Sequence, residues 1–191
     1  TREQAIEAVV AALGETDAIV STTGKISREL YECRDRAGQG HQQEFLTVGS
    51  MGHASQIAMG IALAKPDRQV FCLDGDGAVL MHMGGAAIVG AAGVANFKHV
   101  IFNNGVHDSV GGMATVGLRV SFTEIVKACG YTEAWRVERR EDLAEKVAQL
   151  RSVRGPAMLE IMVQKGARAD LGRPKTSPIE NKTAFTEFLS Q

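Results

Sequence analysis

The chain has 191 residues and a mass of 20.4 kDa, enough for one domain with a core between three layers of secondary structure. Hydrophobic residues make up 45% and charged residues 23% of the sequence, ordinary values that exclude a largely disordered protein. The formal net charge is −1 and no apolar run approaches the roughly 20 residues that span a bilayer, so we expect neither nucleic acid nor membrane as a partner.

The three cysteines, Cys33, Cys72 and Cys129, are widely separated and odd in number. This pattern fits a reducing cytoplasm better than a disulfide scaffold, and no signal peptide is visible. We therefore expect a cytoplasmic protein. Because the first residue is Thr rather than Met, we expect a mature chain, a trimmed form or a piece of a longer protein.

Helical and extended patterns alternate along the first third of the chain. Apolar residues at helical spacing predict a helix at 3–13, and short apolar runs predict strands at 18–20 and 45–48. Polar loops at 21–25 and 49–53 follow these strands, and each loop leads into a helix, the first of them starting near Ser27.

The central stretch reads as a strand, a helix and a second strand. A buried strand is predicted at 70–73, a tight turn at 74–77 and a helical stretch of small residues after it. A second buried strand at 99–102 ends in two asparagines, and residues 105–117 are too polar and rich in glycine for either period.

The remaining elements continue the alternation: a helix near 122–129, a strand at 132–137, a helix at 141–150 and a strand at 157–163. Six strands alternating with helices predict an α/β protein with three α/β/α layers, in which a six-stranded, mainly parallel sheet is covered on both faces. We expect residues 1–165 to form the binding domain. Residues 166–191 should form a tail with a short helix on the outside.

Asp76 and Asn104 each follow a predicted buried strand. The carboxyl ends of parallel strands meet at the edge of the sheet where such proteins bind ligands. Carboxylate and amide oxygens are hard ligands that suit Mg²⁺ or Ca²⁺, and the flanking Gly75 and Gly77 leave backbone N–H groups open to a phosphate. The alternative is an ordinary acidic turn and a polar strand end.

Gly-Asp-Gly at 75–77 followed by Asn-Asn at 103–104 resembles the binding signature of thiamine-diphosphate enzymes. The resemblance implies the thiamine-diphosphate-binding fold and the cofactors thiamine diphosphate and Mg²⁺. It implies that Asp76, Asn104 and the carbonyl oxygen of Val106 hold the metal. The diphosphate would lie on this metal and on the backbone of Gly75, Gly77 and Ala78.

The segment Gly49-Ser50-Met51-Gly52 resembles the same family. In these enzymes a bulky apolar residue lies under the cofactor and bends its two rings into a V. By this resemblance Met51 takes that catalytic role, and Gly49, Ser50 and Met51 bind the cofactor. The V brings the amino group of the pyrimidine next to the proton it must remove from the thiazolium. Taken alone, a Met51 that fills the core at a strand–helix turn is the plainer interpretation.

Four segments narrow the resemblance to the phosphonopyruvate decarboxylase family: STTGKISREL, FLTVGSMGHAS, DGDGAVLMHMGG and NNGVHDSVGG. The implied reaction is the thiamine-diphosphate- and Mg²⁺-dependent decarboxylation of 3-phosphonopyruvate to phosphonoacetaldehyde and CO₂. Sulfopyruvate decarboxylase beta subunits and acetolactate synthases share the Gly-Asp-Gly and Asn-Asn motifs. A different 2-oxo acid therefore remains an alternative, as does a module that binds the cofactor without catalysis.

A phosphonopyruvate molecule carries roughly three negative charges, so its site needs cationic or N–H-rich loops. The candidate substrate residues lie in the loops after the predicted strands: Lys25, Arg28, His53, His107 and Ser109. A solvated lysine or a helix-capping serine is the plainer reading of such residues, and His82 is a weaker candidate than these five.

The resemblance also implies that this chain holds only half of an active site. Enzymes of this family bind the cofactor between two domains, and the second domain supplies a Glu that acts on the pyrimidine ring. No Glu of this chain lies in a matching context. We therefore expect a complementary pyrimidine-binding domain or subunit as a partner, assembly into an oligomer, and no decarboxylase activity from this chain alone.

Overall fold

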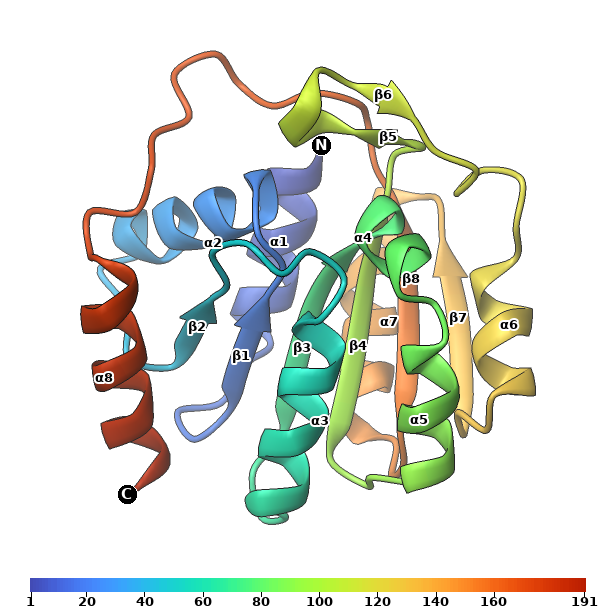
Figure 1. The fold of residues 1–191 in the computed structure, drawn as a ribbon, viewed down its shortest axis with the longest axis horizontal. Coiled ribbons are helices and arrows are strands. Elements are labelled where there is room, and N and C mark those ends of the chain that lie inside the picture. The colour runs from blue at the N-terminus through green and yellow to red at the C-terminus, as the bar shows by residue number, and fades with distance from the viewer.

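Six strands form one sheet in the computed structural model, which describes residues 1–191 (Figure 1). The strands are β1 (Ala18–Ser21), β2 (Glu44–Leu46), β3 (Val70–Gly75), β4 (Phe97–Asn103), β7 (Glu133–Val137) and β8 (Ala157–Met162). Their order is β2-β1-β3-β4-β8-β7, and every neighbouring pair is parallel. This sheet confirms the predicted fold class.

Helices cover both faces of the sheet. One face carries α1 (Arg2–Ala11), α2 (Lys25–Arg36) and α7 (Leu143–Ser152), and the other carries α3 (Ala54–Ala64), α5 (Gly85–Ala92), α6 (Phe122–Ala128) and α8 (Pro178–Leu189). Successive strand residues point to opposite faces, so Phe71 and Leu73 join the first core while Val70 and Cys72 join the second. None of the helices combines the length and the apolar character needed to cross a membrane.

The direction in which the chain adds strands to the sheet reverses between β1 and β3. Helix α2 leads from β1 outward to β2 on one face, whereas α3 leads from β2 back to β3 on the other face. The loop after β1 and the start of α4 (Asp76–Met81) after β3 therefore diverge at the carboxyl edge of the sheet. Such a switch of direction opens a crevice in which parallel α/β proteins bind ligands.

The prediction of a tight turn at 74–77 is wrong. Strand β3 continues through Gly75, and α4 begins at Asp76 without an intervening turn. The predicted single helical stretch is also two helices, α4 and α5, separated by residues 82–84. Adjacent glycines at 84 and 85 have poor helix propensity, which favours a break at this position.

One helix boundary and one loop also differ from the prediction. Helix α2 begins at Lys25 rather than near Ser27. The segment 105–117 contains a small antiparallel hairpin, made of β5 (Val106–His107) and β6 (Met113–Ala114), with a short 3₁₀ turn, η1 (Asp108–Val110), between its strands. A hairpin this short has too few residues for its alternation to be recognised in the sequence.

Helix α8 packs beside the edge strand β2 and covers its free side (Figure 1). The carboxamide of Asn181 forms hydrogen bonds with the backbone of β2. Its Oδ1 accepts from the N–H of Leu46 at 3.0 Å, and its Nδ2 donates to the carbonyl of Glu44 at 2.9 Å. Phe185 and Phe188 are buried in the second core. A side chain thus replaces the pairing that an edge strand lacks. The division of the chain into a binding domain at 1–165 and a tail at 166–191 stays a prediction.

We predict that Asn181→Ala lowers the free energy of unfolding by about 1–3 kcal/mol, because it leaves a buried N–H and a buried carbonyl of β2 without partners. Urea denaturation measures this loss. The matched control is Lys182→Ala, an exposed position on the same helix that should stay within about 0.5 kcal/mol of wild type. If both variants are equally stable, Asn181 does not cap the sheet edge.

Candidate active site

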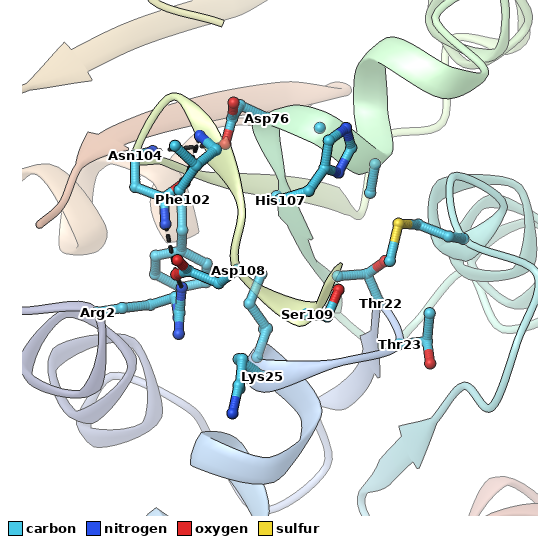
Figure 2. A pocket seen from close by; sticks show the side chains of 16 residues that line it. Arg2, Thr22, Thr23, Lys25, Asp76, Phe102, Asn104, His107, Asp108 and Ser109 are labelled. Carbon is cyan, nitrogen blue, oxygen red and sulfur yellow. Dashed lines mark hydrogen bonds and ion pairs between the residues drawn. The ribbon is translucent and has the colours of Figure 1, made fainter. Parts of the chain in front are cut away.

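A pocket opens at the carboxyl ends of β1, β3 and β4 (Figure 2). Ten of the residues predicted from the sequence line it: Lys25, Met51, Gly75, Asp76, Gly77, Ala78, Asn104, Val106, His107 and Ser109. These residues come from four separate stretches of the chain, and the parallel sheet alone brings them together.

Asp76 is the first residue of α4, and its carboxylate is almost completely buried. One carboxylate oxygen accepts a short hydrogen bond from the Thr115 hydroxyl, and the other accepts from the N–H of Asn104 at 3.4 Å. Burial raises the pKa of Asp76 above its ordinary value, although these hydrogen bonds and one from the N–H of Gly77 lower it. A cation at this position would stabilise the ionised carboxylate.

The side chain of Asn104 is held in one orientation (Figure 2). Its Nδ2 donates to Oδ2 of Asp108 at 2.7 Å, and its Oδ1 accepts from the N–H of Val106 at 3.1 Å. Because a carboxylate can only accept, Asp108 fixes which end of the amide is the donor. The amide oxygen is thereby turned away from Asp108 and remains an available ligand.

Asp108 in turn is held by Arg2, a buried residue at the start of α1. Arg2 Nη1 donates to Asp108 Oδ2 at 2.6 Å, while Nε and Nη2 donate to the two carboxylate oxygens of Glu29 at 2.6 and 2.9 Å. Burial by itself lowers the pKa of Arg2, but its two carboxylate partners raise it above the ordinary value. The guanidinium therefore stays charged and joins α1 and α2 to the pocket.

Asn103 fixes the two ends of the segment 105–117. Its Nδ2 donates to the carbonyl of Gly117 at 2.8 Å and to Glu160 Oε1 at 2.7 Å, and its Oδ1 accepts from the N–H of Gly105 at 3.1 Å. Burial raises the pKa of Glu160 above its ordinary value. The two asparagines thus have different tasks, since Asn103 closes the loop and Asn104 faces the pocket.

The loop after β2 has an unusual backbone. Gly49, Ser50 and Gly52 have φ angles of +76°, +48° and +91°, and Ser50 is the one non-glycine residue of the chain in this region. A side chain at Gly52 would lie 2.7 Å from the carbonyl oxygen of Ala78, so only glycine fits there. This turn brings Met51, half-buried, to the pocket wall. Backbone strain of this kind is common at functional sites.

The proposed substrate residues do not all converge. Lys25, His107 and Ser109 line the pocket, and the His107 ring lies so close to Gly77 that an added Cβ would be 2.3 Å from it. His53 lies outside the pocket lining and packs against His82, with ring centroids 4.0 Å apart and the ring planes tilted by 32°. Arg28 lines a different cavity, between α2 and the tail.

Several residues of the site were not predicted from the sequence: Arg2, Thr22, Glu29, Asn103, Asp108, Thr115 and Glu160. Asp108 lies in the segment NNGVHDSVGG, between the predicted substrate residues His107 and Ser109, so its neighbourhood carried a signal. Arg2 and Thr115 carried none, because their contacts join residues that are far apart in the chain.

The residues present fit a divalent cation and a phosphate group. The carboxylate of Asp76 and the amide oxygen of Asn104 are oxygen donors of the kind that Mg²⁺ takes. The Thr22 hydroxyl is buried beside the pocket and has no hydrogen-bond partner. An orphaned donor of this kind matches a phosphate oxygen, because a buried polar group otherwise costs free energy.

Comparisons with known proteins agree with this geometry. Residues 22–161 match the family described as thiamine pyrophosphate enzyme, C-terminal TPP binding domain. The chain is 40% identical over 190 residues to phosphonopyruvate decarboxylase of Streptomyces viridochromogenes, which covers 100% of this chain and 46% of that enzyme. It thus spans about half the length of the phosphonopyruvate decarboxylases it matches.

Two further similarities concern a subunit and a fold. Over 126 residues the chain is 38% identical to sulfopyruvate decarboxylase subunit beta of Methanocaldococcus jannaschii, covering 65% of this chain and 64% of that subunit. The crystal structure of benzoylformate decarboxylase from Polynucleobacter necessarius superposes with a TM-score of 0.75 at 17% identity, covering 88% of this chain and 34% of that one. At this identity the superposition shows the fold alone.

We predict that Asp108→Asn weakens Mg²⁺ binding about 10- to 100-fold, because an amide at this position can also donate and no longer fixes the orientation of Asn104. Calorimetric titration of Mg²⁺ in the presence of thiamine diphosphate measures the effect. Asp170→Asn, which removes the same charge from an exposed position, is the control and should change nothing. Unchanged Mg²⁺ affinity in folded Asp108→Asn would contradict this role.

Proposed function

Because the chain belongs to the thiamine pyrophosphate enzymes, whose C-terminal TPP-binding domain it matches, we propose that it forms the diphosphate-binding half of a Mg²⁺-dependent 3-phosphonopyruvate decarboxylase. The observation that carries this proposal is the meeting of Asp76 and Asn104, 28 residues apart in the chain, at one pocket. The 40% identity to phosphonopyruvate decarboxylases over the whole chain supports the choice of substrate.

The residues of the pocket divide the work of binding. Asp76, the Asn104 amide oxygen and the Val106 carbonyl would hold Mg²⁺, with Asn104 kept in orientation by Asp108. The Thr22 hydroxyl and the backbone N–H groups at the start of α4 would donate hydrogen bonds to the diphosphate. When bound, the cofactor supplies a thiazolium that can take up the electron pair left by departing CO₂.

The other residues of the pocket act on geometry and charge. Met51, raised by its left-handed turn, would support the bent shape of the cofactor. Lys25, His107 and Ser109 would bind the anionic substrate through charge-assisted or hydroxyl hydrogen bonds. We drop His53 from this group, because it lies outside the pocket lining, and assign Arg28 to a separate cavity.

A second polypeptide segment would complete the active site. The relatives include the beta subunit of a sulfopyruvate decarboxylase, a name that implies at least one other subunit in that enzyme. We propose that a complementary pyrimidine-binding domain or subunit packs over this pocket, supplies the missing acidic group and excludes water. Decarboxylation of sulfopyruvate is the second candidate, favoured by the same relative, and assays of the assembled enzyme with both 2-oxo acids separate the two.

We predict that Asp76→Asn weakens Mg²⁺-dependent binding of thiamine diphosphate by more than about 100-fold, because the metal loses its one anionic protein ligand. Calorimetry of thiamine diphosphate with Mg²⁺, and again after EDTA, gives the affinity and its metal dependence. Asp67→Asn, at an exposed position before β3, is the control. Equal affinity in folded Asp76→Asn and wild type would refute the metal site.

Met51→Ala tests the geometric role separately. In the assembled enzyme we expect kcat to fall on the order of a hundredfold while the affinity for thiamine diphosphate changes only a few-fold, because a displacement of about 1 Å can cost that much rate. Steady-state kinetics and calorimetry on the same variant provide the two values. A parallel loss of affinity and kcat would instead make Met51 a simple binding or packing residue.

A further inference from the structure

A second cavity, of about 320 Å³, lies between the first turn of α2, the end of β2 and the tail that precedes α8. Two arginines, Arg28 from α2 and Arg173 from the tail, line it together with five hydroxyl side chains, and no aspartate or glutamate does. It touches the first pocket only at Thr23, which lines both. The cavity is therefore polar and lined by cationic groups without acidic ones.

The absence of an ion pair sets Arg28 apart from other arginines of the same helix. Farther along α2, Arg34 pairs with Glu44 at 3.2 Å and Arg36 pairs with Glu7 at 3.0 Å. The guanidinium of Arg28 forms no ion pair and no hydrogen bond within the protein. The arginines near the end of α2 are therefore paired with glutamates, whereas Arg28, at the cavity, is unpaired.

The tail shows the same contrast. Arg168 bonds to Glu3 at 2.8 Å and also pairs with Glu32, and Lys175 pairs with Asp35 at 3.2 Å, so these contacts attach the tail to α1 and α2. Arg173 lies between these attachments, yet its guanidinium has no partner in the protein. Arg173 is therefore positioned at the cavity by the backbone of the tail and not by a hydrogen bond or ion pair of its side chain.

A hydroxyl group adds an independent observation. The Oγ1 atom of Thr176 is buried, lines the same cavity and has no hydrogen-bond partner. Ser27 and Thr47 bond to backbone carbonyls, at 2.6 and 2.8 Å, and are already satisfied. One unpaired donor and two unpaired guanidinium groups therefore border one space.

We propose that this cavity binds a tetrahedral oxyanion, the phosphate or phosphonate end of a small molecule, between Arg28 and Arg173 with the Thr176 hydroxyl as a further donor. Guanidinium groups bind such anions through paired N–H donors, and two of them match the charge of a dianion. The anion would also bridge α2 and the tail, so it should stabilise the fold. The site does not rest on the proposed function.

Two sources of this chemistry can be distinguished in the assembled enzyme. If the anion is the phosphonate of the substrate, Arg173→Gln raises KM for phosphonopyruvate and leaves KM for pyruvate unchanged. If it is a separate phosphate, Arg173→Gln leaves both KM values unchanged while phosphate binding is still lost. Either result is consistent with the site and names its occupant.

The test of the site itself is calorimetric titration of the chain with inorganic phosphate, without Mg²⁺ or thiamine diphosphate, and then with methylphosphonate and acetate. We expect one site that prefers the two tetrahedral anions, and at least about tenfold weaker binding in Arg28→Gln and in Arg173→Gln. Thr176→Val should weaken binding by a smaller factor. Phosphate should raise the melting temperature of wild type but not of the arginine variants.

Arg154→Gln is the matched control, because Arg154, like Arg173, is an exposed arginine without a partner. It lies before β8, at the amino ends of the strands and so away from the cavity. It should bind phosphate as wild type does. Circular dichroism verifies folding, which we expect to be kept since neither arginine bonds to the protein. No phosphate binding by wild type, or equal loss in Arg154→Gln and the two site variants, would overturn the proposal.

Discussion

The buried carboxylate of Asp76 organises the segment that follows β4 at the pocket. A charge removed from water must find partners inside the protein, since an unsatisfied one costs several kcal/mol. Here the segment 105–117 folds back so that the Thr115 hydroxyl reaches the carboxylate, and the start of this segment offers the N–H of Asn104. Asn103 then holds both ends of the folded segment. The pocket wall is thus built around one charged group.

A second buried charge extends this arrangement to the beginning of the chain. Arg2 is shared between Glu29 and Asp108, and Asp108 orients Asn104. Removing one partner of such a buried network is far more costly than the network is worth in stability, because a charge is left unpaired. Helix α1 therefore belongs to the site, although its sequence pattern predicts only a helix at 3–13.

The carboxyl edge of the sheet carries two cavities of opposite chemistry. In the first, Asp76 and Asn104 offer oxygen atoms to a cation. In the second, Arg28 and Arg173 offer N–H groups to an anion. The edge can separate these functions because α2 carries Lys25 toward one cavity and Arg28, one turn later, toward the other. A partner domain over the pocket would lie close to both.

The amino-acid sequence was sufficient to predict the six strands, their mainly parallel arrangement, and Asp76 and Asn104 as neighbours at one edge. These features follow from local periodicity and from residues placed at strand ends. The sequence did not predict the break between α4 and α5 and the hairpin at 106–114, where short elements leave little pattern. The packed structure was needed to show that Arg2 bonds to Asp108, that Thr115 reaches Asp76 and that Arg28 lines a second cavity. These contacts join segments that are remote in the chain. No local sequence pattern specifies which buried polar groups will pair once the helices pack.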